Sequence, residues 1–129
     1  MNQDETYEAG MTVRRQVLGD AHVDRTAGNV NAFNGDFQHF ITRYAWGEVW
    51  TRPELARRER SLITLAMLIA LNREEEFRMH VRAALHNGVT VAEIKEVLLQ
   101  SGIYCGLPAA NGAYHAAERV FVELGIDFK

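Results

Sequence analysis

The stretch EFRMHVRAALHNG, residues 76–88, holds the most informative pattern in the chain. Its apolar side chains recur at the spacing of one helical face: Phe77, Val81, Ala84 and Leu85. Glu76 and His80 are four residues apart, so they lie together at the border of that face, close enough to hydrogen-bond. A carboxylate beside an imidazole can move protons near neutral pH. The same spacing also fits a surface ion pair or a histidine that hydrogen-bonds locally.

Helix signals continue along the chain, which has two prolines and no alternating strand pattern. Thr90 and Glu93 have the spacing of a capping box, and Gly88 stands where a glycine ends the preceding helix. Pro53 suits the first turn of a helix, whereas residues 22–34 look irregular. The sequence predicts an all-α fold of about six helices. They are expected to cover residues 5–18, 36–50, 53–72, the segment that ends at 88, 90–105 and 108–125.

Length and composition exclude several classes of protein. A chain of 129 residues suits a single domain, residues 1–129, with a real hydrophobic core. The net charge of −3 and the mixing of basic with acidic residues give no basic stripe, so nucleic acid is not an expected partner. One cysteine excludes an internal disulfide, and no apolar N-terminal segment marks secretion, so we expect a cytoplasmic location. The longest apolar run, residues 62–71, is shorter than a bilayer span, so no membrane contact is expected.

Other side chains could also carry chemistry. Cys105 lies near a predicted helix C-terminus, where the dipole disfavours a thiolate, so we expect it to serve packing. Between residues 106 and 111 one helix ends and the next begins. The free N–H groups of the new helix could hold an anion, but a simple turn between two helices explains these residues better. An arginine that faces a cleft would bind a carboxylate. The candidates are Arg57, Arg58, Arg60 and Arg73. No third ligand accompanies Glu76 and His80, so we expect no metal site.

Five blocks of sequence carry a resemblance to a known family: RRQVLGDAHV (14–23), FQHFITRYAWGEVWTRPEL (37–55), RSLITLAML (60–68), EFRMHVRAALHNGVT (76–90) and EIKEVLLQSGIYCGLPAAN (93–111). Through these blocks, nearly the whole chain resembles the carboxymuconolactone decarboxylase family. YAWGEVWTRP, within the second block, is the part most specific to the decarboxylases. The resemblance implies an alkylhydroperoxidase D-like orthogonal helical bundle. It also implies a homo-oligomer, most often a hexamer, whose active sites can lie near subunit contacts.

The resemblance further implies an activity. Members of the family decarboxylate 4-carboxymuconolactone to β-ketoadipate enol-lactone in protocatechuate catabolism. No cofactor is expected, because electrons left by CO2 delocalise to the lactone carbonyl. On this reading His80 donates the proton, and Glu76 orients the imidazole and raises its pKa. Arg73 and Arg60 anchor substrate carboxylates.

Two alternatives stay open. One is a thiol peroxidase of the same superfamily, whose signature is Cys-x-x-Cys-x-x-x-His. Aligned on His80, its two cysteines would stand where this chain has Arg73 and Glu76. The other is a non-catalytic helical module that serves oligomerisation.

Overall fold

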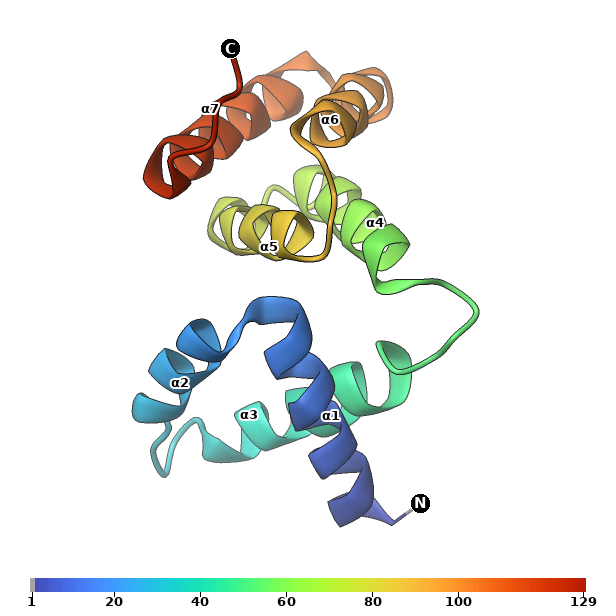
Figure 1. The fold of residues 1–129 in the computed structure, drawn as a ribbon, viewed down its shortest axis with the longest axis vertical. Helices are drawn as coiled ribbons and strands as arrows, with labels where there is room; N and C mark the ends of the chain where they lie inside the picture. Colours follow the sequence, from blue (N-terminus) through green and yellow to red (C-terminus); the bar gives the residue numbers. More distant parts are fainter. Residues whose placement is uncertain (1) are drawn as a thin grey trace. The chain divides into compact units, whose positions relative to one another are not determined.

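The computed structural model describes residues 2–129, in which all regular structure is helical and no strand occurs (Figure 1). The prediction of an all-α fold is therefore confirmed. Contacts between residues divide the chain into two compact units, one ending at Arg57 and the other comprising residues 58–129. The expectation of a single domain stays a prediction.

The first unit consists of three α-helices and one π-helix. The bounds are Gln3–Leu18 for α1, Asp20–Gly28 for α2, Gly35–Ile41 for α3 and Thr42–Val49 for the π-helix η1, which continues α3. Asn2 caps α1, because its side-chain oxygen accepts a hydrogen bond from the Glu5 backbone N–H at 2.8 Å. Gly19 has a φ of 90°, a conformation open to glycine, and there the chain passes from α1 into α2.

Two glycines allow α1 to lie directly on η1. A Cβ atom at Gly10 would stand 2.1 Å from the Thr42 carbonyl oxygen and 2.8 Å from the Gly47 backbone nitrogen. A Cβ atom at Gly47 would stand 2.4 Å from the Thr6 carbonyl oxygen. Both contacts involve backbone atoms, which cannot turn aside as a side chain can. The close approach of these two helices therefore depends on the absence of side chains at the crossing.

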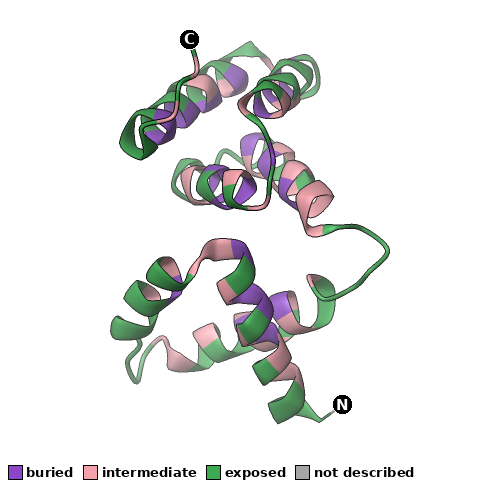
Figure 2. Ribbon diagram, in the orientation of Figure 1, coloured by how far each residue is buried: buried purple, intermediate pink, exposed green. Residues whose placement is uncertain are grey.

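The second unit consists of four α-helices. The bounds are Arg57–Ala70 for α4, Glu74–His86 for α5, Val91–Cys105 for α6 and Leu107–Leu124 for α7. The predicted capping box is confirmed: Thr90 Oγ1 accepts from the Glu93 N–H at 3.1 Å, and Glu93 Oε1 accepts from the Thr90 N–H at 2.9 Å. Figure 2 shows buried positions recurring along α5 and α7. The large side chains of this unit's core are Leu65, Ile69, Phe77, Val81, Val89, Ile94, Leu98, Val120 and Phe121.

The helix boundaries differ from expectation in three places. Residues 20–28 are helical, and the turn made by Asn31 and Asn34 follows the end of α2. Pro53 does not open a helix; residues 51–56 form turns, and α4 starts at Arg57. The helix expected from residue 36 becomes π-helical at Thr42. The described residues thus form seven α-helices and one π-helix in place of about six. None of these helices is long and apolar enough to cross a membrane.

The crossing of α1 and η1 generates a prediction about stability. Gly10→Ala should lower the free energy of unfolding by about 3 kcal/mol, because the new methyl group must displace backbone. Gly28→Ala is the matched control, since its Cβ would meet no atom within 4 Å, and it should stabilise by up to about 1 kcal/mol. Urea unfolding followed by circular dichroism measures both. Equal midpoints for the two variants would contradict the close crossing.

Candidate active site

A tight turn joins α4 to α5. The Arg73 N–H donates to the Leu68 carbonyl at 3.0 Å, and the Asn72 N–H donates to the Ile69 carbonyl at 3.1 Å, so the last carbonyls of α4 are satisfied. Asn72 has a φ of 59° and is the one described non-glycine residue with a positive φ. Asparagine tolerates this left-handed conformation better than most residues do. The turn places Asn72 and Arg73 at the start of α5, and both side chains are exposed.

Helix α5 carries the predicted acid–base pair. Its first turn holds three carboxylates, Glu74, Glu75 and Glu76. The positive end of the helix dipole stabilises negative charge there. His80 is 9% exposed and lies in the buried part of the helix, whereas Glu76 is exposed. Because the segment is an α-helix, the two residues are about 40° apart around its axis. The helix itself is confirmed, and the coupling of the two side chains stays a prediction.

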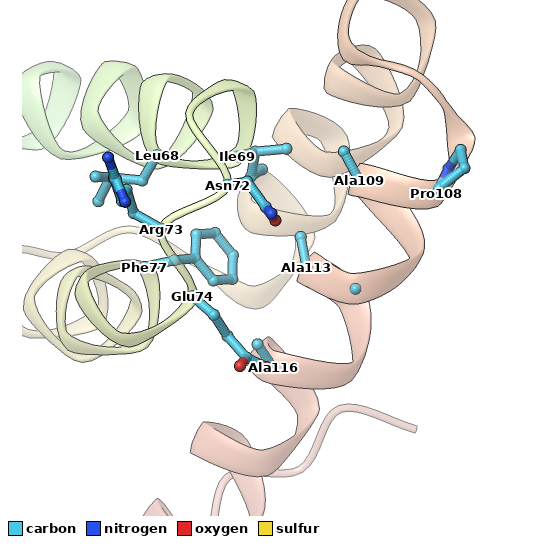
Figure 3. A pocket seen from close by; sticks show the side chains of 11 residues that line it. Leu68, Ile69, Asn72, Arg73, Glu74, Phe77, Pro108, Ala109, Ala113 and Ala116 are labelled. Atoms are coloured by element: carbon cyan, nitrogen blue, oxygen red, sulfur yellow. The ribbon is translucent and has the colours of Figure 1, made fainter.

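A pocket of ≈ 290 Å³ lies where the α4–α5 turn meets α7 (Figure 3). Its polar side chains are Asn72, Arg73 and Glu74. In Figure 3 the Asn72 amide points from the turn toward α7, and the Phe77 ring stands between α5 and α7. The remaining lining comes from α4 and α7: Leu68, Ile69, Pro108, Ala109, Gly112, Ala113 and Ala116. The pocket is therefore small, with apolar walls and charge at one edge.

The charges at the pocket favour an anion at one end. Arg73 supplies a cation, and Glu74 lies 3.9 Å from Arg119, so part of its negative charge is offset. The first residues of α7 line the pocket as well, and no side chain caps that helix. Its first N–H groups carry partial positive charge, although Pro108 lacks one such group. A carboxylate held by Arg73 would thus meet a second favourable field from α7.

The structure separates the two predicted carboxylate anchors. Arg73 follows the end of α4 and lines the pocket, whereas Arg60 is half-buried in the first turn of the same helix. The rise of the helix sets them roughly 15 Å or more apart. The residues that line this pocket do not include Arg60, Glu76 or His80. One of the four predicted site residues therefore reaches it.

Polar contacts beside Arg60 join the other ends of α4 and α5. Ser61 is fully buried, and its Oγ accepts a hydrogen bond from Asn87 Nδ2 at 3.3 Å. The same amide group donates to the Ala83 carbonyl at 2.9 Å. This link fixes the C-terminal end of the helix that carries His80.

Asn72 and Gly112 are among the pocket residues that the sequence analysis did not single out. Asn72 could have been found, because an asparagine that follows a long apolar run and precedes an acidic helix start is typical of a left-handed helix end. Gly112 carries no such signal, since its place in the wall depends on how α7 packs. Cys105, the single thiol, is half-buried and packs against the core. The described residues contain no cluster of three or more His, Cys, Asp or Glu side chains that could hold a metal.

Residues 35–119 match the model of the carboxymuconolactone decarboxylase family. The chain belongs to this family. The matched region begins at α3 and ends within α7, so it contains the pocket and both members of the predicted acid–base pair. The family membership implied by the sequence blocks is thus confirmed, and with it the alkylhydroperoxidase D-like helical fold.

The chain is also similar to three individual proteins, all of them named as decarboxylases. The 4-carboxymuconolactone decarboxylase of Acinetobacter baylyi is 56% identical over 126 residues, covering 98% of this chain and 94% of the relative. The nitrosuccinic acid decarboxylase of Metarhizium robertsii is 42% identical over 118 residues, covering 92% and 82%. A 4-carboxymuconolactone decarboxylase sequence from Pseudomonas putida is 58% identical over 48 residues, covering 37% of this chain and all of that sequence.

Proposed function

We propose that this protein is a carboxy-lyase that converts 4-carboxymuconolactone to β-ketoadipate enol-lactone and CO2 in protocatechuate catabolism. The observation that carries the proposal is the 56% identity, over 98% of the chain, to a protein with that name. Nitrosuccinic acid, named for the relative at 42% identity, is a smaller acid and the less supported substrate. The single cysteine supports a cytoplasmic location.

The proposed substrate supplies its own electron sink. When the bond from the ring carbon to CO2 breaks, the electron pair spreads through the ring double bond to the lactone carbonyl oxygen. A proton is then added to carbon. The protein must hold the carboxylates, stabilise negative charge on the lactone oxygen and deliver that proton. None of these tasks calls for a metal or an organic cofactor.

The residues of the second unit can meet these needs in part. His80 is the proposed proton donor, and Glu76 is the proposed residue that orients it. The burial of His80 supports this role, because a buried imidazole can transfer a proton without competition from bulk water. Arg73 is the proposed carboxylate anchor, supported by its place at the pocket. Arg60 is the alternative anchor, for a substrate bound at the other end of α4.

The acid–base assignment predicts non-additive kinetics. His80→Gln should lower kcat/KM by roughly 10²- to 10⁴-fold, and Glu76→Gln should lower it less. The double variant should lose little beyond His80→Gln alone, because groups that act as a unit are non-additive. The measurement is steady-state turnover of 4-carboxymuconolactone, with circular dichroism as the check on folding. Near-wild-type turnover in folded His80→Gln would refute the assignment.

The anchor assignment predicts a difference between two arginines. Arg73→Gln should raise KM roughly ten- to hundredfold, because it removes a charge-assisted hydrogen bond to the substrate. Arg60→Gln is the matched comparison and should leave KM near the wild-type value. The reverse result would move the anchor to Arg60.

Gly112→Leu tests the pocket itself, because Gly112 lines the cavity and a Cβ atom there would meet no atom within 4 Å. A folded Gly112→Leu variant should show a raised KM. An unchanged KM would exclude this pocket as the substrate site.

We also propose that the chain forms a homo-oligomer, with a hexamer as the form that family resemblance suggests. The outer surface around the end of α6 is apolar and exposed, with Ile103 and Tyr104 78% and 81% exposed. Leu99 and Leu107 extend this patch. Monomeric proteins seldom leave large contiguous apolar patches in water.

Ile103→Lys should therefore lower the assembled mass measured by light scattering. Val122→Lys, an exposed apolar position on α7 outside the patch, is the control and should keep the mass. A wild-type mass of one chain, or equal masses for both variants, would contradict an interface at α6.

A further inference from the structure

Arg14, on α1 in the first unit, is a buried cation whose partners are neutral. Its residue is 8% exposed. Nη1 donates to Thr42 Oγ1 at 3.0 Å, and Nη2 donates to Gln38 Oε1 at 3.3 Å. Nε is also buried and meets no acceptor among the described residues. The guanidinium is thus held by a hydroxyl and an amide, with one donor unused.

This arrangement is unusual for a buried charge. Removing a guanidinium from water is costly, and proteins normally offset the cost with a carboxylate. Burial lowers the pKa of Arg14, and the Tyr7 phenol only partly opposes that effect. The neighbouring Arg15 shows the ordinary arrangement: it is more exposed, and it pairs with Asp20 at 3.1 Å and Asp24 at 3.0 Å. Arg15, the more exposed of these two neighbours, thus pairs with carboxylates, whereas within residues 2–129 Arg14 bonds only to Thr42 and Gln38.

Of the two side chains that bond to Arg14, Gln38 is the one that a ligand could displace. Thr42 is buried, and its hydroxyl donates to the Gln38 carbonyl at 2.9 Å while it accepts from Arg14, so it is fixed on both sides. The Gln38 side chain is half-buried and makes the longer of the two contacts. It can turn toward solvent without breaking the backbone of α3. A carboxylate in its place would form a shorter, charge-assisted bond.

The backbone at this position also departs from regular α-helix. Thr42 is the first residue of η1, and π-helical turns occur frequently at functional sites. Thr42 Oγ1 meets Arg14 of α1, and α1 lies close to η1 because of the two glycines at the crossing. The cation, its neutral partners and the irregular helix therefore occur together.

We propose that Arg14, Gln38 and Thr42 form a binding site for a small organic carboxylate, which displaces the Gln38 amide and neutralises the guanidinium. The carboxylate belongs to a soluble metabolite of the size of succinate. A second source of the same chemistry is an acidic side chain of another copy of this chain, and the experiment below separates the two. The site is defined by binding and does not depend on the decarboxylase reaction.

Thermal unfolding of the full chain tests the site, with succinate compared against sodium chloride at equal ionic strength. For wild type, succinate at ten times its Kd should raise Tm by about 5 °C beyond the salt control. Arg14→Met should abolish this difference. It should also unfold at an equal or higher Tm without succinate, because it removes a buried charge that lacks a carboxylate. Arg15→Gln, the matched control, should respond as wild type does.

Gln38→Glu provides an independent variant, in case Arg14→Met does not fold. It supplies the missing carboxylate within the chain, so it should raise Tm without succinate and remove the response to succinate. A wild type that does not respond, or a succinate response that persists in Arg14→Met or Gln38→Glu, would overturn the proposal. Light scattering should give equal masses for wild type and Arg14→Met. A lower mass in the variant would assign the carboxylate to a second copy and overturn the small-molecule site.

Discussion

The packing of one apolar stripe of α5 determines where the polar groups of the candidate site lie. Phe77, Val81 and Ala84 are at most 2% exposed, and the burial of each large side chain contributes about 1.5–3 kcal/mol. Once that stripe is in the core, rotation about the helix axis is fixed. His80 must then lie in the buried part of the helix and Glu76 at its exposed border. A buried imidazole and a solvent-facing carboxylate on adjacent turns follow from that single constraint.

Local signals made much of the second unit predictable from sequence. Thr90 and Glu93 satisfy each other's backbone groups, so the start of α6 depends on few distant contacts. Gly88 and Gly125 follow the ends of α5 and α7 with positive φ, as their positions in the sequence indicated. The π-helix at Thr42, by contrast, has no local signal, because it depends on how α1 packs against it. The pocket has no local signal either, because its walls come from α4, α5 and α7. The sequence shows Arg73 as a cation, but the length of α4 sets its distance from Arg60.

The first turn of α5 also bears on which chemistry this family member can perform. A thiol mechanism needs two cysteines in exchange distance, and this chain has only Cys105, at the end of α6. The corresponding positions hold Arg73, just before α5, and Glu76, in its first turn, a cation and an anion. Charged side chains of this kind cannot form a disulfide. The start of the same helix therefore has a positive and a negative side chain at the positions where the thiol peroxidases have their two cysteines.

Each unit holds an energetically unfavourable group next to closely packed residues. In the second unit, Asn72 adopts a left-handed backbone that places it at the pocket, next to the densely buried stripe of α5. In the first unit, Arg14 is desolvated without a carboxylate, next to the glycine crossing that brings α1 onto η1. A strained or unsatisfied group persists only where the surrounding structure holds it in place. The glycines at 10 and 47 allow α1 and η1 to lie close, and the bond from Arg14 to Thr42 joins the same two helices. Tight packing thus creates the conditions under which a polar group can be held ready for a ligand.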